Sequence, residues 1–124
     1  MNIETEMTLG IRHERFAAIR YEQRDKKGAV IGLQLGRHFV RKWIVVEAWK
    51  YISAGIVTAD RGKLHTTESL FNNPAVWDGY DEDRKKGIHI AIGRCLAYFV
   101  QLKMLPLERF NPDQNNALYR FIGQ

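Results

Sequence analysis

The stretch that decides the fold runs from 105 to 122: LPLERF at 105–110, NPDQNN at 111–116 and ALYRFI at 117–122. The middle six residues concentrate Asn, Pro and Asp, which is a strong turn signal. The last six are rich in aromatic and branched side chains, which favour β-strands. We expect the first six to form the partner strand. The stretch therefore predicts a C-terminal β-hairpin.

A helix is predicted directly before this hairpin, from Asp81 to about Lys103. Its apolar side chains recur at spacings of four, three, four and three, so they share one helical face. These residues are Ile88, Ile92, Cys95, Phe99 and Leu102. Asp81 is expected to cap the helix, because its side chain accepts hydrogen bonds from backbone N–H groups of the first turn. Pro106 ends the helix.

Two elements are predicted nearer the N-terminus. Residues 15–35 alternate between apolar and polar types around a Gly-containing turn at 25–28, which is typical of a β-hairpin. A helix over 5–24 is the competing interpretation, because apolar residues there also fit helical spacing. Residues 37–54 are apolar on two helical faces, which predicts a helix buried between two layers. Gly55 is expected to follow this helix as its C′ residue.

The middle of the chain is less regular. A short helix is predicted over 66–71, capped by Thr66 with Ser69 at the third helical position. Asn72-Asn73-Pro74 is expected to end it. Trp77-Asp78-Gly79-Tyr80 is interpreted as a loop anchored by two aromatic side chains.

Length and charge limit the class of protein. The chain has 124 residues, which fits one domain over 1–124, with a hairpin at 15–35 and a core at 37–124. Nineteen Lys and Arg against fourteen Asp and Glu give a net charge of +5. A basic balance attracts polyanions such as DNA, although it also serves solubility alone.

The sequence predicts a cytoplasmic protein. Cys95 is the only cysteine, so no internal disulfide forms. The first six residues are acidic and polar, unlike a signal peptide. No apolar run approaches the roughly 20 residues of a membrane span, so no membrane contact is expected.

No catalytic site, metal site or cofactor is expected. The four histidines are widely spaced, and the sequence has no phosphate-binding loop, nucleophile elbow or dinucleotide fingerprint. Cys95 lies in an apolar helical stretch, where a buried, unreactive thiol is the default. Carboxylates at 78 and 81–83 are explained by helix capping more simply than by a bound Mg²⁺. The chain is therefore interpreted as a non-enzyme.

The order of helix, short link and hairpin at the C-terminus resembles the winged helix-turn-helix superfamily. The matching stretch runs from Arg94 to Leu107, and the wing would be 111–116. The resemblance implies an α+β fold: a small winged-helix-like domain with an N-terminal β-hairpin. It covers the last third of the chain well and residues 37–71 loosely.

Two features depart from the superfamily pattern. A long aromatic loop at 72–80 stands where a compact second helix is usual. Gly93 and Ala97 lie four residues apart on the helix face that would meet DNA. Small residues at this spacing let another helix approach closely, which argues against an open face for reading DNA.

The resemblance implies a set of DNA-binding residues in the helix and wing. They are Arg84, Lys85, Lys86, His89, Arg94, Arg109 and Arg120. Arg94 would read guanine through two parallel hydrogen bonds, whereas the 84–86 run would hold phosphates. The alternatives are a solvated helix start and, for the wing arginines, cross-strand pairing with Glu108. A further basic cluster, Arg37, Arg41 and Lys42, is expected to solvate an otherwise apolar helix.

Three functions remain open. The leading one is a transcriptional regulator that binds duplex DNA as a homodimer, with the 15–35 hairpin as a dimer element. The second is a small inhibitor or adaptor of the kind that a phage or mobile element encodes, binding a protein through Trp77 and Tyr80. Packing of these two aromatics onto the core is the alternative. The third is RNA or single-strand binding through exposed aromatics.

Overall fold

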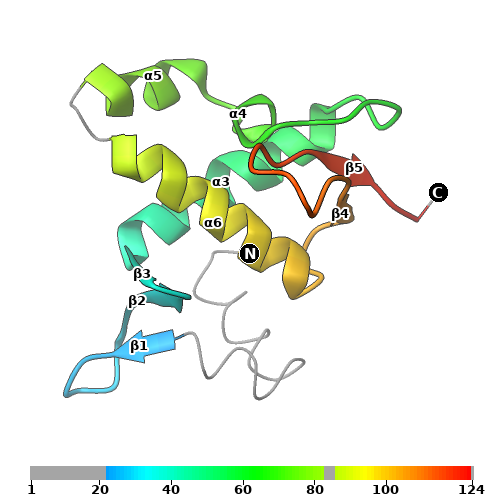
Figure 1. The fold of residues 1–124 in the computed structure, drawn as a ribbon. Helices are drawn as coiled ribbons and strands as arrows, with labels where there is room; N and C mark the ends of the chain where they lie inside the picture. The colour runs from blue at the N-terminus through cyan, green and yellow to red at the C-terminus, as the bar shows by residue number, and fades with distance from the viewer. Residues whose placement is uncertain (1–21, 83–85, 124) are drawn as a thin grey trace.

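The computed structural model describes residues 22–82 and 86–123, which form a mixed α+β fold (Figure 1). A three-stranded antiparallel sheet comes first, several helices follow, and a two-stranded sheet ends the chain. The elements are β1 (Glu22–Arg24), β2 (Val30–Leu35), β3 (His38–Arg41), α3 (Lys42–Thr58), α4 (Thr67–Leu70), α5 (Pro74–Glu82), α6 (Lys86–Gln101), β4 (Leu107–Arg109) and β5 (Tyr119–Phe121).

The predicted N-terminal hairpin is confirmed over its described residues. Strands β1 and β2 pair antiparallel, with Glu22 opposite Leu33. The Asp25 carboxylate accepts hydrogen bonds from the backbone N–H groups of Lys27 and Ala29, at 2.8 and 3.0 Å. Residues 15–21 lie outside the described part of the chain. The competing helix over 5–24 is wrong where it reaches β1, and a role of the hairpin in a homodimer stays a prediction.

The predicted helical start at residue 37 is wrong. Residues 38–41 form β3, which pairs antiparallel with β2 from Leu35↔His38 to Gly32↔Arg41. The physical reason is that the edge of β2 has unpaired backbone groups, and β3 satisfies them. Burial of Val40 against the core suits a strand as well as a helix, so its apolar character did not distinguish the two.

The predicted helix end at Gly55 is also wrong, because α3 continues to Thr58. Gly55 is buried inside the helix, where a Cβ atom would lie 1.9 Å from the carbonyl oxygen of Leu70. The glycine therefore serves a close approach of α3 to the end of α4. It does not serve the left-handed backbone conformation of a C′ residue.

The predicted loop at 77–80 is a helix. Residues 74–82 form α5, so Asp81 lies within α5 and not at the start of the next helix, α6, which is described from Lys86. Pro74 suits the first helical position, and the Asn73 side chain accepts a hydrogen bond from the N–H of Val76 at 3.2 Å. Asn73 and Pro74 thus begin a helix as well as ending α4. The short helix α4 is confirmed, with the predicted capping pair of Thr66 and Ser69.

The core lies between the helix pair α3–α6 and the two sheets. The predicted apolar face of α6 is confirmed, because Ile88, Ile92, Cys95, Phe99 and Leu102 are all buried. The ring of Trp49 on α3 meets Phe99 on α6 edge to face, with centroids 5.1 Å apart. Leu33 and Val40 of the first sheet belong to the same buried cluster. Figure 1 shows α6 running across α3, with the first sheet below this pair.

Replacing Gly55 by alanine tests the contact between α3 and α4. We expect Gly55→Ala to lower the free energy of unfolding by roughly 1–3 kcal/mol, because the added methyl would overlap the backbone carbonyl of Leu70 and force the two helices apart. Gly79→Ala is the matched control, because it lies inside α5 and its Cβ meets no atom within 4 Å. We expect this control to stabilise the protein by about 0.5–1 kcal/mol. Equal urea midpoints for the two variants would contradict the contact.

Candidate nucleic-acid interface

One face of α6 is open to solvent. The side chain of Ile90 is 57% exposed, and Arg94, Ala97 and Gln101 are exposed further along the helix. We call these four residues the α6 strip. Helix α6 contains no Asp or Glu. The strip therefore presents one guanidinium, one amide, the large apolar side chain of Ile90 and the methyl group of Ala97, without a carboxylate of its own helix.

A groove runs along one side of the α6 strip. It has a volume of about 690 Å³ and separates α6 from the β4–β5 loop, residues 110–118. Ile90, Arg94 and Ala97 line it from α6, and Arg109 and Asn115 line it from the hairpin. The expected approach of another helix is seen at Gly93, because the nearest atom to a Cβ on Gly93 is the hydroxyl of Thr67, the first residue of α4, at 3.7 Å. Ala97, one turn further along, is exposed at the groove.

The β4–β5 loop is organised from within by Asn111, which is only 9% exposed. Its Oδ1 accepts hydrogen bonds from the Leu118 N–H at 2.8 Å and from Arg109 Nε at 3.0 Å. Its Nδ2 donates to the carbonyl oxygen of Asn116 at 2.7 Å. The sequence predicted a turn here but not this role for Asn111. Nothing in the sequence distinguishes Asn111 from Asn115 and Asn116 in the same turn stretch.

Arg109 and Arg120 face opposite sides of the C-terminal hairpin. Arg109 lies opposite Tyr119 in the strand register, and both line the groove. Arg120 lies opposite Glu108 and forms an ion pair with it. Neighbouring strand residues point to alternate faces, so this pair lies on the other face. The cross-strand pairing offered as an alternative is therefore confirmed for Arg120.

The guanidinium of Arg109, the second arginine at the groove, is partly engaged in hydrogen bonds within the β4–β5 loop. Arg109 donates from Nη2 to the carbonyl oxygen of Gln114 at 2.5 Å, in addition to its bond to Asn111. Burial raises the pKa of the neighbouring Tyr119 phenol, and the positive charge of Arg109 acts in the opposite direction. Arg94 has no such loop contacts, so it is the more accessible cation of the two.

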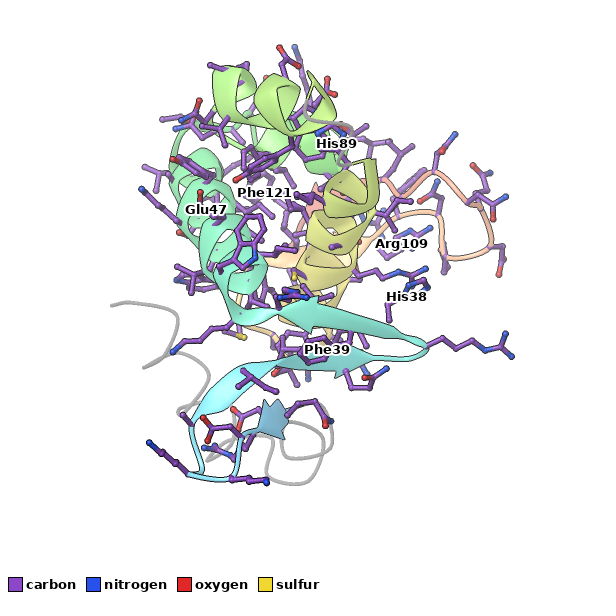
Figure 2. The ribbon with its side chains drawn as sticks, turned by 90° about the vertical axis from the view of Figure 1, so that its left-hand side faces the viewer. His38, Phe39, Glu47, His89, Arg109 and Phe121 are labelled. Carbon is purple, nitrogen blue, oxygen red and sulfur yellow. The ribbon has the colours of Figure 1, made fainter. Side chains whose placement is uncertain are left out.

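The other predicted helix residues are only partly described. Arg84 and Lys85 lie outside the described residues, and Lys86 begins α6. His89 is half-buried and stacks on Trp77, with ring centroids 4.0 Å apart and planes 5° from parallel. Its Nε2 lies 2.7 Å from the Trp77 carbonyl oxygen. Figure 2 shows His89 at the end of α6 that faces α5. The ring of His89 is thus engaged in packing α5 onto α6.

The packing alternative is confirmed for Trp77 and Tyr80. Trp77 is 9% exposed, and its ring centroid lies 5.3 Å from that of Phe71. Tyr80 is half-buried and donates its hydroxyl to Glu47 at 3.1 Å. Burial, followed by the negative charge of Glu47, raises the pKa of Tyr80 to about 12. These aromatics join α5 to the core and offer a partner little surface.

Cys95 is buried on the inner face of α6, as expected. Burial raises the pKa of its thiol to about 12, so the thiol stays protonated at neutral pH. In residues 22–82 and 86–123, no three His, Cys, Asp or Glu side chains converge on a possible metal position.

Comparison of the chain with protein-family models, curated protein sequences and solved structures gives no match. The geometry and charge of the described residues are therefore the basis for assigning a function. Among the helices of that described part, none combines the length and apolarity of a membrane span.

Replacing Asn111 tests the internal order of the β4–β5 loop. We expect Asn111→Ala to lower the free energy of unfolding by roughly 1–3 kcal/mol, because it leaves partly buried N–H and carbonyl groups without partners. The amide proton of Leu118 should exchange faster in this variant, since its acceptor is removed. Asn115→Ala, at an exposed position of the same loop, should change stability by less than about 0.5 kcal/mol. Unchanged Leu118 exchange in Asn111→Ala would refute this role.

Proposed function

We propose that this chain binds duplex DNA by placing the α6 strip in the major groove. The observation that carries the proposal is that the strip is exposed, contains Arg94 and no carboxylate, and lies beside a loop ordered from within. An α-helix fits the major groove, where an arginine fork pairs with the O6 and N7 atoms of guanine. Such binding is the activity of a transcriptional regulator.

The order of elements supports a winged-helix-like arrangement for this role. Two helices, α4 and α5, precede α6, and the β4–β5 hairpin follows it directly. Helix α5 stands where the sequence predicted the long loop over 72–80, which departed from the winged-helix pattern. In this arrangement α6 is the recognition helix and the β4–β5 loop is the wing. Arg109 lies at the base of that wing, where an arginine meets the DNA backbone.

Charge supports the same partner. The net charge is +5, so the molecule attracts a polyanion over a distance of about one Debye length. Glu68 is the acidic residue that lines the groove. Its carboxylate repels phosphate, so the DNA is expected to approach the outer ridge of α6 and not the groove floor. Arg94 stands on that ridge.

Removing the charge at Arg94 tests the proposal. We expect the affinity of Arg94→Ala for a random duplex of about 30 base pairs to fall about tenfold at low salt. The slope of log K against log salt should shrink by about one, because one fewer counterion is released. Lys50→Ala is the control, because it removes one charge from an exposed position on α3, the helix behind α6. Fluorescence anisotropy at low and moderate salt measures both quantities.

Two results would overturn the DNA assignment. One is the absence of duplex binding by the unaltered protein at low salt. The other is an equal loss of affinity in Arg94→Ala and Lys50→Ala, which would mean that net charge alone drives binding and that no surface is specific.

One observation favours the second candidate function, a protein-binding inhibitor or adaptor. The indole of Trp43 on α3 is 44% exposed beside a hollow that Val46 and Glu47 also line. Half-exposed tryptophans are enriched at the centres of protein interfaces. Figure 2 shows Glu47 and Arg109 on opposite sides of the helix pair, so this surface is separate from the α6 strip. Trp43→Ala should leave DNA binding unchanged while weakening any complex formed through this surface.

A further inference from the structure

The turn between β2 and β3 is a tight hairpin with an arginine at its tip. Leu35 pairs with His38, so Gly36 and Arg37 are the two turn residues. Gly36 has a φ of +64°, the left-handed region that a glycine at the first position of a type II′ turn supplies. Gln34 donates from Nε2 to the Gly36 carbonyl oxygen at 2.9 Å. The Gln34 hydrogen bond and the β2–β3 pairing fix the conformation of the turn, and Arg37 is exposed at its tip.

This turn lies against the α6 strip. A hollow of about 210 Å³ is lined by Leu35 and Gly36 on one wall and by Arg94, Ala97, Tyr98 and Gln101 on the other. Arg94 and Ala97 also line the larger groove beside the β4–β5 loop. They therefore form a ridge between two hollows, one bounded on its outer side by the β2–β3 turn and the other by the β4–β5 loop. The two elements lie on different flanks of this ridge, and in Figure 2 both extend to the right of α6, with the β4–β5 loop above the β2–β3 turn.

Arg37 differs from Arg24 and Arg120 in its partners. Arg24 is paired with Glu22 at 2.6 Å, and Arg120 is paired with Glu108. Within the described residues, no carboxylate forms an ion pair with Arg37. The sequence analysis grouped Arg37 with Arg41 and Lys42 as cations that solvate a helix. Strand β3 separates Arg37 from that helix, so solvation of α3 does not explain it.

A helix in the major groove has a phosphate backbone on each side, because the groove is only about 12 Å wide. Elements that project on both sides of the helix meet both backbones and set its position. We propose that the β2–β3 turn is a second phosphate-contacting element, with Arg37 as its cation, opposite the β4–β5 loop. The proposal rests on DNA binding through α6. It gives the N-terminal sheet a direct part in binding.

The hairpin at the other end of the same sheet supplies a matched control. Lys27 is an exposed cation in the β1–β2 turn. The β1–β2 and β2–β3 turns lie at opposite ends of β2, which has six residues. A strand of that length spans roughly 20 Å. Arg37→Ala and Lys27→Ala thus remove the same charge from the same sheet, but only Arg37 belongs to the turn whose Gly36 lies against α6.

The test measures duplex affinity as a function of salt for these two variants and for Arg37→Lys. We expect Arg37→Ala to bind several-fold more weakly at low salt, with the slope of log K against log salt reduced by about one. Lys27→Ala should keep the slope of the unaltered protein. Arg37→Lys should also keep it, because a lysine retains the charge that displaces a counterion. Circular dichroism checks that each variant is folded.

The outcomes separate this proposal from the one on which it rests. Equal slopes for Arg37→Ala and Lys27→Ala, with Arg94→Ala still impaired, would overturn the role of the turn and leave DNA binding through α6 intact. Absence of duplex binding by the unaltered protein would overturn both. A smaller slope of log K against log salt in Arg37→Ala, but not in Lys27→Ala, would support a phosphate contact on each side of α6.

Discussion

The packing of α6 on α3 is the contact on which the rest of the structure depends. Ile92, Cys95 and Phe99 are fully buried on the inner face of α6. Burying each large apolar side chain of this kind contributes about 1.5–3 kcal/mol, so several along one face fix the rotation of the helix about its axis. Once that rotation is fixed, the strip from Ile90 to Gln101 has to face solvent.

The two sheets attach to this helix pair at separate places. The first sheet buries Leu33 and Val40 in the shared core. The second buries Leu107 and Tyr119, and Tyr119 also exchanges two backbone hydrogen bonds of 2.8 Å with His65. Each hairpin therefore keeps its buried end in the core and its turn in solvent. The positions of the turns on either side of α6 follow from core packing and not from contacts between the turns.

The arginines in the described part of the chain differ in whether their side chains are already bonded to other residues. Arg24 and Arg120 are held in ion pairs, and Arg109 is bonded within the β4–β5 loop. The Arg120–Glu108 pair is exposed on both sides and contributes little to stability, whereas the Glu22 side chain of the other pair is only 3% exposed. Arg94 and Arg37 stand outside these ion pairs and on one side of the molecule. A polyanion that meets this side gains charge-assisted hydrogen bonds without first breaking a carboxylate pair.

The sequence by itself determined the features that depend on local periodicity and turn chemistry. The spacing of Ile88, Ile92 and Phe99 predicted the buried face of α6, and the Asn and Pro content of 111–116 predicted the loop of the hairpin. Arg94 followed from these as an exposed residue.

Tertiary structure decided the rest, because one residue type serves several environments. Gly55 marks a close backbone approach instead of a helix end, Val40 is buried in a strand instead of a helix, and Asn73 begins α5 as well as ending α4. A local sequence pattern indicates which side chains are buried and which residues end a helix. The element that packs against them across the core decides whether the backbone there is a strand or a helix. For the same reason the sequence did not predict that Gly36 of the β2–β3 turn lies beside α6, since only the packing of the sheet brings the two together.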